Sequence, residues 1–371
     1  MTLKRKSLRF WLVSGTAFAL LFMAIGLVAN HFTIQSRIGH FADRFQLLSV
    51  LRKEALEQYF ETLRAEITFW SLDDDLLNRQ AELLGAQEAF RKAGGDDSAR
   101  VDYEFAMSAI QARLHVLASL FVAKRGYYDF FLITPEGDVI YTVEKESDYQ
   151  TNLLSGPWRD TGLAGVYRRA LESAGENRVV FSDFEAYGPS EGAPAMFMAR
   201  AMVGPEGRVL GVLAMQLPTN RIRDIMQFTA GMGESGETYL VGEDLLMRSD
   251  SRFREESTIL QVKVDTESVR RALSGESGTL FTPDYRGVPV LSAFSDLTVD
   301  DFRWAVMAEI DRDEVLRTIS GNRNQIAGVM LFLYAITLWT LWYIREGDWA
   351  TGDTLSGPAD TDHTDIGDTG I

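Results

Sequence analysis

Two long apolar runs, one near each end of the chain, dominate its pattern of hydrophobic and polar positions. Residues 10–29 are twenty residues without a charge, and residues 326–344 form a second uncharged run of nineteen. At a rise of 1.5 Å per residue, runs of this length cross a hydrocarbon core of about 30 Å. The pattern therefore predicts two transmembrane helices, at residues 10–30 and 326–344.

The residues that flank these runs orient the predicted spans. Four basic residues precede the first run: Lys4, Arg5, Lys6 and Arg9. By the positive-inside rule, residues 1–9 are cytoplasmic and the segment between the spans lies outside. A cleaved signal peptide is the alternative for the first run, although its apolar region is usually only about 7 to 15 residues. A buried core helix is the alternative for the second run, although aromatic residues near its end match an interfacial belt: Trp339, Trp342 and Tyr343.

The chain that follows the first run has a helical pattern. Apolar residues recur there mostly at steps of three and four: Ile34, Ile38, Phe41, Phe45, Leu48, Leu51, Leu56, Tyr59, Leu63, Ile67 and Trp70. This spacing predicts one helix over residues 31–72, about 60 Å long. Because sustained near-heptad patterns pack against a partner, we interpret the stripe as a dimer contact, with packing on the chain's own domain as the alternative. Two more helical segments, separated by Gly94-Gly95, complete a predicted helical stalk over residues 31–125.

From residue 126 the apolar positions follow the shorter period of strands. A first module has one short helix and five predicted strands: helix 165–173 and strands 127–133, 139–143, 178–184, 195–203 and 209–217. A similar order then returns: strands 237–241 and 246–249, helix 266–273, and strands 278–282, 288–294 and 304–310. Residues 212–217 also resemble residues 305–310, which supports a tandem repeat.

These elements define an α+β fold class. The prediction is a long N-terminal helix followed by two tandem PAS-like antiparallel-sheet modules, at residues 126–218 and 219–318. A linking helix within residues 218–230 joins the modules. Two transmembrane helices flank the whole.

Composition narrows the class of protein. The chain has 53 acidic and 37 basic residues, a formal net charge of −16, and no cysteine. A chain this acidic is not expected to bind DNA or RNA, since that affinity rests on Lys and Arg displacing counterions. The lack of cysteine excludes disulfides, thiolate metal sites and a cysteine nucleophile. Residues 345–371 carry seven acids and one base, and are predicted to be a disordered acidic cytoplasmic tail.

No motif in the sequence carries catalytic chemistry. Residues 231–236 (GMGESG) fit the spacing G-x-G-x-x-G, but a dinucleotide site needs a strand before the motif and a helix after it. Here the predicted order is reversed, so we interpret the motif as a glycine-rich turn. The four histidines are far apart, and HExxH, G-x-S-x-G and P-loop motifs are absent from the sequence. We therefore expect no metal, no cofactor and no enzymatic activity.

The order of the elements and three sequence stretches together resemble a known family. The stretches are residues 126–133 (GYYDFFLI), 183–190 (DFEAYGPS) and 236–241 (GETYLV). Over residues 10–344 the chain resembles the double Cache (tandem PAS-like) sensor region of bacterial chemoreceptors, histidine kinases and nucleotide cyclases. The resemblance implies a multi-pass inner-membrane protein whose periplasmic domain binds a small molecule, and a homodimer.

In this family a HAMP helix pair and then a kinase, cyclase or methyl-accepting domain normally follow the second span. No such domain follows residue 344 in this sequence. The signal is therefore expected to pass to a separate cytoplasmic or membrane partner, or to an effector that is encoded elsewhere or lost. A scaffolding role, in which the ectodomain binds a periplasmic protein, is the alternative function.

A small-molecule pocket needs apolar or aromatic walls and a few placed polar groups. The membrane-distal module, residues 126–218, supplies nine candidates: Tyr128, Asp129, Phe131, Tyr141, Trp158, Arg159, Asp183, Tyr187 and Phe197. Asp183 would suit an amine, whereas Arg159 would suit a carboxylate. Side chains alternate along strand 127–133, so only one of its faces can line a pocket. The ligand is left open as an amino acid, an organic acid or an amine.

The membrane-proximal module offers a second set of candidates: Tyr239, Arg248, Asp250 and Tyr285. This set is ranked second because the resemblance places ligands more often in the distal module. Amino-acid-binding members of the family carry a tyrosine and an arginine, then Trp-Tyr, then a distant aspartate. Trp158-Arg159-Asp160 matches that signature only in part, so an amino-acid ligand has no clear support from sequence.

Overall fold

The computed structural model describes residues 2–94, 97–320 and 323–352. The chain divides into two compact units. One unit is formed by residues 40–315, and the other by residues 1–39 together with the segment from residue 316 onward. Most of the predicted acidic tail, residues 353–371, lies outside the described residues.

The first helix runs without a break from the first apolar run into the stripe that follows it. α1 covers Thr2–Ser71, so the predicted continuity is confirmed. Within the unit of residues 40–315, one side of α1 is buried: Phe45, Leu56, Phe60, Leu63 and Ile67. Ser49 Oγ on the same side lies 2.7 Å from Ser295 Oγ. The stripe thus packs on the chain's own modules, while Leu47, Leu51 and Phe69 remain exposed on α1.

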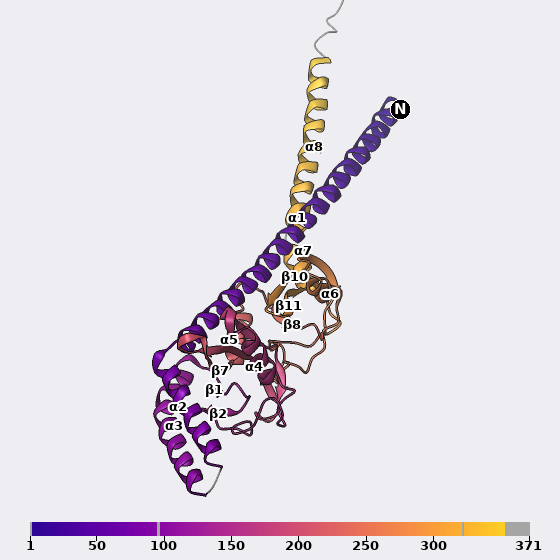
Figure 1. Cartoon of the computed structure of the whole chain (residues 1–371). Coiled ribbons are helices and arrows are strands. Elements are labelled where there is room, and N and C mark those ends of the chain that lie inside the picture. Colours follow the sequence, from indigo (N-terminus) through magenta and orange to yellow (C-terminus); the bar gives the residue numbers. More distant parts are fainter. Residues whose placement is uncertain (1, 95–96, 321–322, 353–371) are drawn as a thin grey trace, which may run out of the picture. The chain divides into compact units, whose positions relative to one another are not determined.

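Two further helices follow, α2 (Asp74–Lys92) and α3 (Asp97–Arg125), and they lie side by side (Figure 1). The break between α1 and α2 falls at Asp73, whose carboxylate caps α2 by accepting the N–H of Leu76 at 2.9 Å. α3 buries one side against the distal module: Met107, Gln111, Leu114, Ala118 and Val122.

The distal module is a five-stranded antiparallel sheet in the order β2-β1-β7-β6-β3, with a separate hairpin of β4 and β5. Its elements are β1 (Asp129–Ile133), β2 (Val139–Thr142), α4 (Gly162–Glu172), β3 (Val179–Phe181), β4 (Glu185–Tyr187), β5 (Ala193–Ala195), β6 (Phe197–Val203) and β7 (Val209–Gln216), with short 3₁₀ turns at Ala174–Glu176 and Pro205–Gly207. The predicted strand 178–184 leaves the sheet early, because Asp183 turns its carboxylate onto the N–H of Phe184 at 2.7 Å and onto the proximal module.

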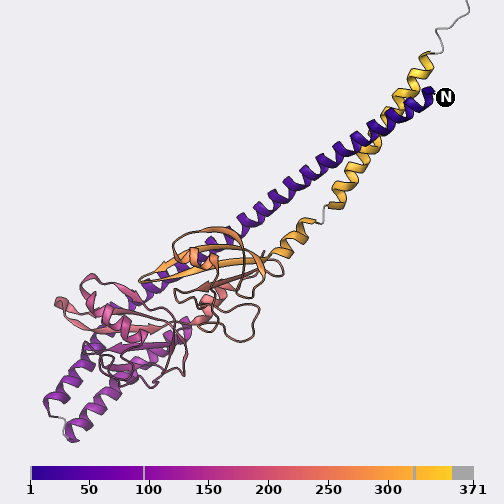
Figure 2. The same ribbon diagram turned by 90° about the vertical axis from the view of Figure 1, so that its right-hand side faces the viewer.

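The proximal module repeats this plan with four strands in the order β8-β11-β10-β9 (Figure 2). Its elements, with the helices before and after it, are α5 (Thr219–Met226), β8 (Glu237–Val241), α6 (Glu267–Leu273), β9 (Gly278–Pro283), β10 (Pro289–Val299), β11 (Phe302–Asp311) and α7 (Arg312–Ser320). The order corresponds to β1-β7-β6-β3 of the distal sheet without a partner for β2. The predicted strand 246–249 makes only isolated bridges, since Leu245 is left-handed (φ 66°) and Arg248 folds back against Gly242.

Both faces of each sheet are covered. On one face of the distal sheet, α4 packs on Phe131, Phe197 and Tyr187, and α6 packs in the same way on Tyr239 and Met307 of the proximal sheet. On the opposite faces a single core continues through both modules beneath the helices. Phe60 of α1 contacts Phe181 of the distal module and Trp304 of the proximal module, with ring centroids 5.4 and 5.9 Å apart.

In the other unit, the beginning of α1 contacts α8 (Arg323–Gly352). The Tyr334 hydroxyl donates to the carbonyl of Gly15 at 3.4 Å, and its ring lies edge-on to Phe22. Many large apolar side chains on both helices are exposed: Val13, Leu20, Leu21, Met23, Leu27, Val329, Leu331, Phe332 and Trp339. α8 is helical to Gly352, so the first eight residues of the predicted tail are helical.

By length and composition, two helices of the described chain could cross a membrane: α1 from Gly15 onward, and α3. α8 contributes a shorter apolar segment, residues 328–340. α3 packs on the distal module and buries the amide of Gln111, which donates to the carbonyl of Ile140 at 2.8 Å. These features make α3 a helix of the folded domain. Of the two predicted spans, the one in α1 has a candidate of sufficient length among the described residues, and the described apolar segment of α8 is shorter than the predicted span.

Candidate functional site in the distal module

The predicted site residues are divided between the two faces of the distal sheet. Phe131 and Phe197 lie on the α4 face, where they contact each other and Tyr187. Tyr141 lies on the opposite face, and its hydroxyl is 3.2 Å from Nδ1 of His115 on α3. Along β1 the predicted alternation is confirmed, with Phe131 on the α4 face and Phe130 and Leu132 on the opposite face, but Tyr127, which precedes β1, lies with Phe130. The structure brings only part of the predicted set together.

Asp129 is buried at the start of β1 and holds the end of β2 in place. Its carboxylate accepts the N–H groups of Phe130, Val143 and Glu144 at 2.6 to 3.2 Å, and the hydroxyl of Thr142. Burial raises the pKa of Asp129 to about 7, although these hydrogen bonds oppose the shift. With four donors already bound, this carboxylate has a structural role in the turn after β2.

Asp183 joins the two modules. Its carboxylate accepts a bidentate pair of bonds from the Arg248 guanidinium, at 2.9 and 2.8 Å, and the indole N–H of Trp304 at 2.8 Å. Arg248 is 4 % exposed, so this ion pair is largely desolvated. The carboxylate predicted to orient a ligand instead fixes the distal module to the proximal one.

Arg159 directly follows Trp158, and its guanidinium pairs with a neighbouring residue. It is exposed and lies 3.5 Å from the carboxylate of Asp160. Its guanidinium makes no hydrogen bond to any of the other eight candidates in the described part of the chain.

A carboxylate that the sequence analysis did not select lies among these aromatic residues. Asp148 sits in the loop between β2 and α4 and is fully buried. Its Oδ2 accepts the hydroxyl of Tyr187 at 2.6 Å, whereas its Oδ1 has no hydrogen-bond partner among the described residues. Burial raises the pKa of Asp148, and the nearby charge of Glu146 adds to that shift. The hydrogen bond from Tyr187 and the nearby N–H groups of residues 148 and 149 lower the pKa of Asp148. Neither of these two N–H groups bonds to Oδ1.

Glu146 connects the same loop to its surroundings. Its two carboxylate oxygens accept the hydroxyls of Tyr128 and Ser190, each at 2.7 Å. The hydrogen bond that Tyr128 donates to Glu146 raises the pKa of Tyr128 to about 12, and burial contributes to the same shift. Ser190 in turn receives the amide of Gln216 at 3.5 Å, and Oε1 of that buried amide has no partner.

Glu185 supplies a third carboxylate to this region. It accepts the N–H of Gly162 at the start of α4 at 2.6 Å, and burial raises its pKa. Burial raises the pKa of the Tyr187 hydroxyl, and the charges of Asp148, Glu185 and Glu146 raise it further. All three carboxylates therefore act on one buried phenol. We call Asp148, Glu146, Glu185, Tyr187 and Trp158 the acidic aromatic site.

Trp158 covers this site from the side of the loop. Its indole N–H donates to the carbonyl of Ser147 at 3.1 Å, and its ring lies 6.5 Å from that of Tyr187. Gly188 makes this position possible, because a Cβ there would lie 2.5 Å from the Trp158 ring. The sequence signal for Trp158 and Tyr187 was their aromatic character. The loop acids gave no such signal, since acids in polar loops are normally exposed.

A groove of about 870 Å³ lies elsewhere on the distal module, between α3 and β2. Its lining includes Tyr103, Gln111, His115 and Lys145. Tyr141 is the one predicted site residue that lines it. This groove is on the opposite face of the sheet from the acidic aromatic site.

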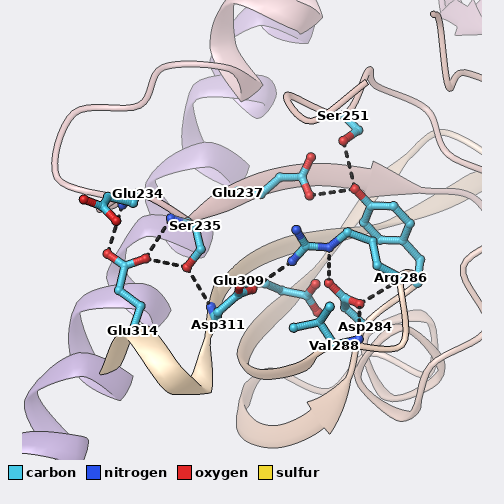
Figure 3. A network of polar contacts seen from close by, with 12 residues as sticks. Glu234, Ser235, Glu237, Ser251, Asp284, Arg286, Val288, Glu309, Asp311 and Glu314 are labelled. Atoms are coloured by element: carbon cyan, nitrogen blue, oxygen red, sulfur yellow. Dashed lines mark hydrogen bonds and ion pairs between the residues drawn. The ribbon is translucent and has the colours of Figure 1, made fainter. Parts of the chain in front are cut away.

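Two of the four second-ranked candidates, Tyr239 and Tyr285, bond Glu309 and Glu237, which belong to the polar network of the proximal module (Figure 3). Tyr239 donates to Glu309 at 2.8 Å, and Tyr285 donates to Glu237 at 3.0 Å. Arg286 spans the carboxylates of Asp284 and Asp311, at 2.6 and 2.9 Å. The other two candidates lie apart from these: Arg248 bonds Asp183, and Asp250 accepts Ser257 and the N–H of Thr258.

The glycine motif at residues 231–236 holds a carboxylate of the chain itself (Figure 3). The N–H groups of Glu234 and Ser235 donate to Glu314 at the start of α7, at 2.9 and 2.7 Å. Gly233 has φ 76°, and a Cβ there would collide with the Glu314 carboxylate. Successive N–H groups of this kind form an anion-binding nest. The motif is therefore a turn, as predicted, with a specific partner.

No metal-binding arrangement is found in the described residues, where no three His, Asp or Glu side chains are placed to hold an ion. The fold and the tandem modules define the class of protein. The family model for the Cache domain, in its double form, matches residues 35–319. The chain belongs to the double Cache family.

Several chemoreceptor domains are among the solved structures to which the chain is similar. The ligand-binding domain of Campylobacter jejuni Tlp3 with 4-methylisoleucine is 12 % identical, with a TM-score of 0.49 and coverage of 76 % of this chain and 94 % of that one. The Pseudomonas aeruginosa amino-acid chemoreceptor PctC with GABA is 13 % identical (TM-score 0.44, coverage 73 % and 100 %). The periplasmic sensory domain of C. jejuni Tlp1 is 14 % identical (TM-score 0.46, coverage 76 % and 98 %). No curated protein matches the chain.

Proposed function

We propose that this protein is a transmembrane receptor that binds a small molecule in its distal Cache module and carries no enzymatic activity. The observation that carries the proposal is the fully buried carboxylate of Asp148, whose Oδ1 has no partner. A buried polar atom without a partner is costly, and a bound ligand is one way to satisfy it. The surrounding Trp158 and Tyr187 provide the aromatic walls that such sites use.

Residues 10–30 and 326–344 are proposed to anchor the receptor in the bacterial inner membrane, with the modules in the periplasm. Apolar side chains that face no protein on both segments support this arrangement, for example Leu27 and Leu331, at 64 and 69 % exposed. The output would pass to a separate effector in the membrane or cytoplasm.

A route for the signal starts at the acidic aromatic site. β4 carries Glu185 and Tyr187, and Asp183 lies two residues before it. Because Asp183 is bonded to Arg248 and Trp304, a ligand that moves β4 would also move the proximal module. Coupling of this kind requires two states that the ligand binds unequally.

The proposal is tested by thermal melting of the full chain in nanodiscs, with amino acids, amines and organic acids as probes. A ligand at a hundredfold excess over its Kd should stabilise the fold by about 2.7 kcal/mol. A single-cysteine variant at Leu51, on the exposed side of α1, then reports on the proposed homodimer by disulfide formation, since the chain has no other thiol. Glu267→Cys on α6 is the control position. A cross-linking rate at Leu51 that no stabilising probe changes would count against signalling.

A further inference from the structure

We propose that the ligand of the acidic aromatic site is a cationic amine that carries no carboxylate, held by Asp148 with Glu146 and Glu185 around it. This inference rests on the proposed function and names the chemical class of its ligand.

The atoms without partners at this site are acceptors. Oδ1 of Asp148 is buried and has no donor among the described residues. Oε1 of Gln216 also has none, and the amide of Gln216 donates to Ser190, which bonds Glu146. An ammonium group brings only donors, up to three N–H, whereas a carboxylate brings only acceptors. The unmatched oxygens therefore favour a ligand that donates.

The charge of the site is also unmatched. Within the described residues, none of Asp148, Glu146 and Glu185 is in an ion pair with Lys, Arg or His. The nearest cations along the chain are engaged or turned away: Lys145 Nζ lies over the ring of Tyr149 at 5.6 Å, and Arg159 pairs with Asp160. Of the three, only Asp148 is fully buried. A buried carboxylate without a counter-ion is unfavourable, and an organic cation would supply the missing charge.

The walls of the site suit a cation as well. The Tyr187 hydroxyl bonds Asp148, and the ring of Trp158 lies 6.5 Å from the ring of Tyr187. The faces of such rings attract ammonium groups by cation–π interaction. A metal ion is not favoured, since no three suitable ligands converge within the described ranges.

The charged groups near the site also disfavour an amino acid as the ligand. The carboxylate of an amino acid is usually recognised by a paired guanidinium or by free N–H donors. Here the guanidiniums of Arg159 and Arg169 are turned to other partners, Asp160 and the aspartates at 300 and 301. An amino-acid carboxylate would instead meet three protein carboxylates. The site thus differs in chemistry from one built for a zwitterion.

The sharpest test compares each amine with the amino acid from which it differs by one carboxylate. The probes are histamine and histidine, agmatine and arginine, cadaverine and lysine, and phenethylamine and phenylalanine. Calorimetry and thermal melting on the full chain in nanodiscs should find at least one amine that binds, with its amino acid weaker by about tenfold or more. Asp148→Asn should weaken that amine by about tenfold or more, whereas Asp160→Asn, an exposed acid outside the site, should leave its Kd unchanged.

Tyr187→Phe provides a second variant, because it removes the donor to Asp148 without removing the ring. It should alter amine affinity even if Asp148→Asn does not fold, and circular dichroism checks the fold of each variant. Tighter binding of the amino acid in every pair that binds would overturn the amine assignment and leave the receptor function standing. No stabilisation by any amine, amino acid or organic acid, and no change in cross-linking at Leu51, would overturn both.

Discussion

The two Cache modules carry polar pairs at the same place in the repeat, with different outcomes. In the distal sheet, Asp129 of β1 lies opposite Gln216 of β7, and in the proximal sheet Glu237 of β8 lies opposite Glu309 of β11. The positions correspond because residues 212–217 and 305–310 are the repeated strand. One module thus pairs an acid with an amide, and the other pairs two acids.

The proximal pair is fully satisfied within the protein. Glu309 accepts Tyr239 and Ser292, at 2.8 and 2.7 Å, and Glu237 accepts Tyr285 and the N–H of Arg252. None of the buried polar atoms without partners falls in residues 219–311, all of which are described. In the distal module, Gln216 and Asp148 each keep an oxygen without a donor. The difference is that buried acceptor oxygens without a donor remain in the distal module and none remains in residues 219–311.

The largest effect is expected where the proximal network depends on a cation. Arg286→Met would leave Asp284, whose side chain is 1 % exposed, without its counter-ion. Loss of one partner of a buried pair should lower the free energy of unfolding by about 4 kcal/mol. Urea denaturation followed by tryptophan fluorescence measures this change. Arg270→Met, in an exposed pair with Asp265, is the control and should be silent. Equal stability of the two variants would contradict the proposed dependence on Arg286.

A second prediction concerns pH, and it tests whether the buried acids of both modules behave alike. Burial raises the pKa of Asp129 and of Glu309 to about 7, so the folded chain holds protons that the unfolded chain has already lost. Stability from each group is complete below the unfolded pKa, near 4, and is lost as the pH rises towards 7. Between pH 5 and 7 each group should contribute a loss of about 2 kcal/mol.

Asp129→Asn and Glu309→Gln should each flatten that pH dependence in melting curves taken from pH 4.5 to 7.5. Asp160→Asn is the control, since its carboxylate is exposed. A wild-type chain whose stability rises over this interval would contradict the raised pKa of both groups.

The third prediction makes the comparison between modules directly, with the same substitution in each. Asp148→Asn removes an unmatched buried charge, so in the absence of ligand it should raise the free energy of unfolding by about 1 kcal/mol. Asp284→Asn removes the carboxylate that bonds the Arg286 guanidinium and two N–H groups, so this variant should have a free energy of unfolding lower by about 2 kcal/mol. Thermal melting at pH 7 measures both. A loss of stability in both variants would show that the distal carboxylate is as well satisfied as the proximal one.

The fold could be predicted largely from the sequence because its signals are local. The period of apolar residues determines α1, and the alternation in residues 130–133 determines the two faces of β1. The exceptions have tertiary causes. The predicted strand at 246–249 fails because Arg248 turns to Asp183 of the other module, a contact that no local pattern contains.

The candidate site was less predictable, for a related reason. Aromatic residues such as Trp158 and Tyr187 are rare and large, so selecting them requires only their identity. Asp148 is one of many acids in an acidic chain, and only the fold shows that its side chain is buried and bonded to Tyr187. Asp183 was predicted for the site but joins the two modules instead. Its partners Arg248 and Trp304 lie 65 and 121 residues away in the sequence, so no local pattern indicates them.

The smallest expected effect concerns the end of the proximal module, where the glycine-rich turn contacts α7, the helix that leads towards the second apolar run. Glu314→Gln replaces the carboxylate that accepts the N–H groups of Glu234 and Ser235 with a neutral amide, which weakens both hydrogen bonds. A charge-assisted bond is stronger than a neutral one, so the substitution should cost about 1 kcal/mol locally. Hydrogen exchange of these two amides should then accelerate about fivefold, with Asp313→Asn on the same turn of α7 as the control. Acceleration in both variants would indicate general fraying of α7. Acceleration in Glu314→Gln alone would show that the glycine turn holds α7. A rearranged proximal module would then have a defined contact through which to move that helix.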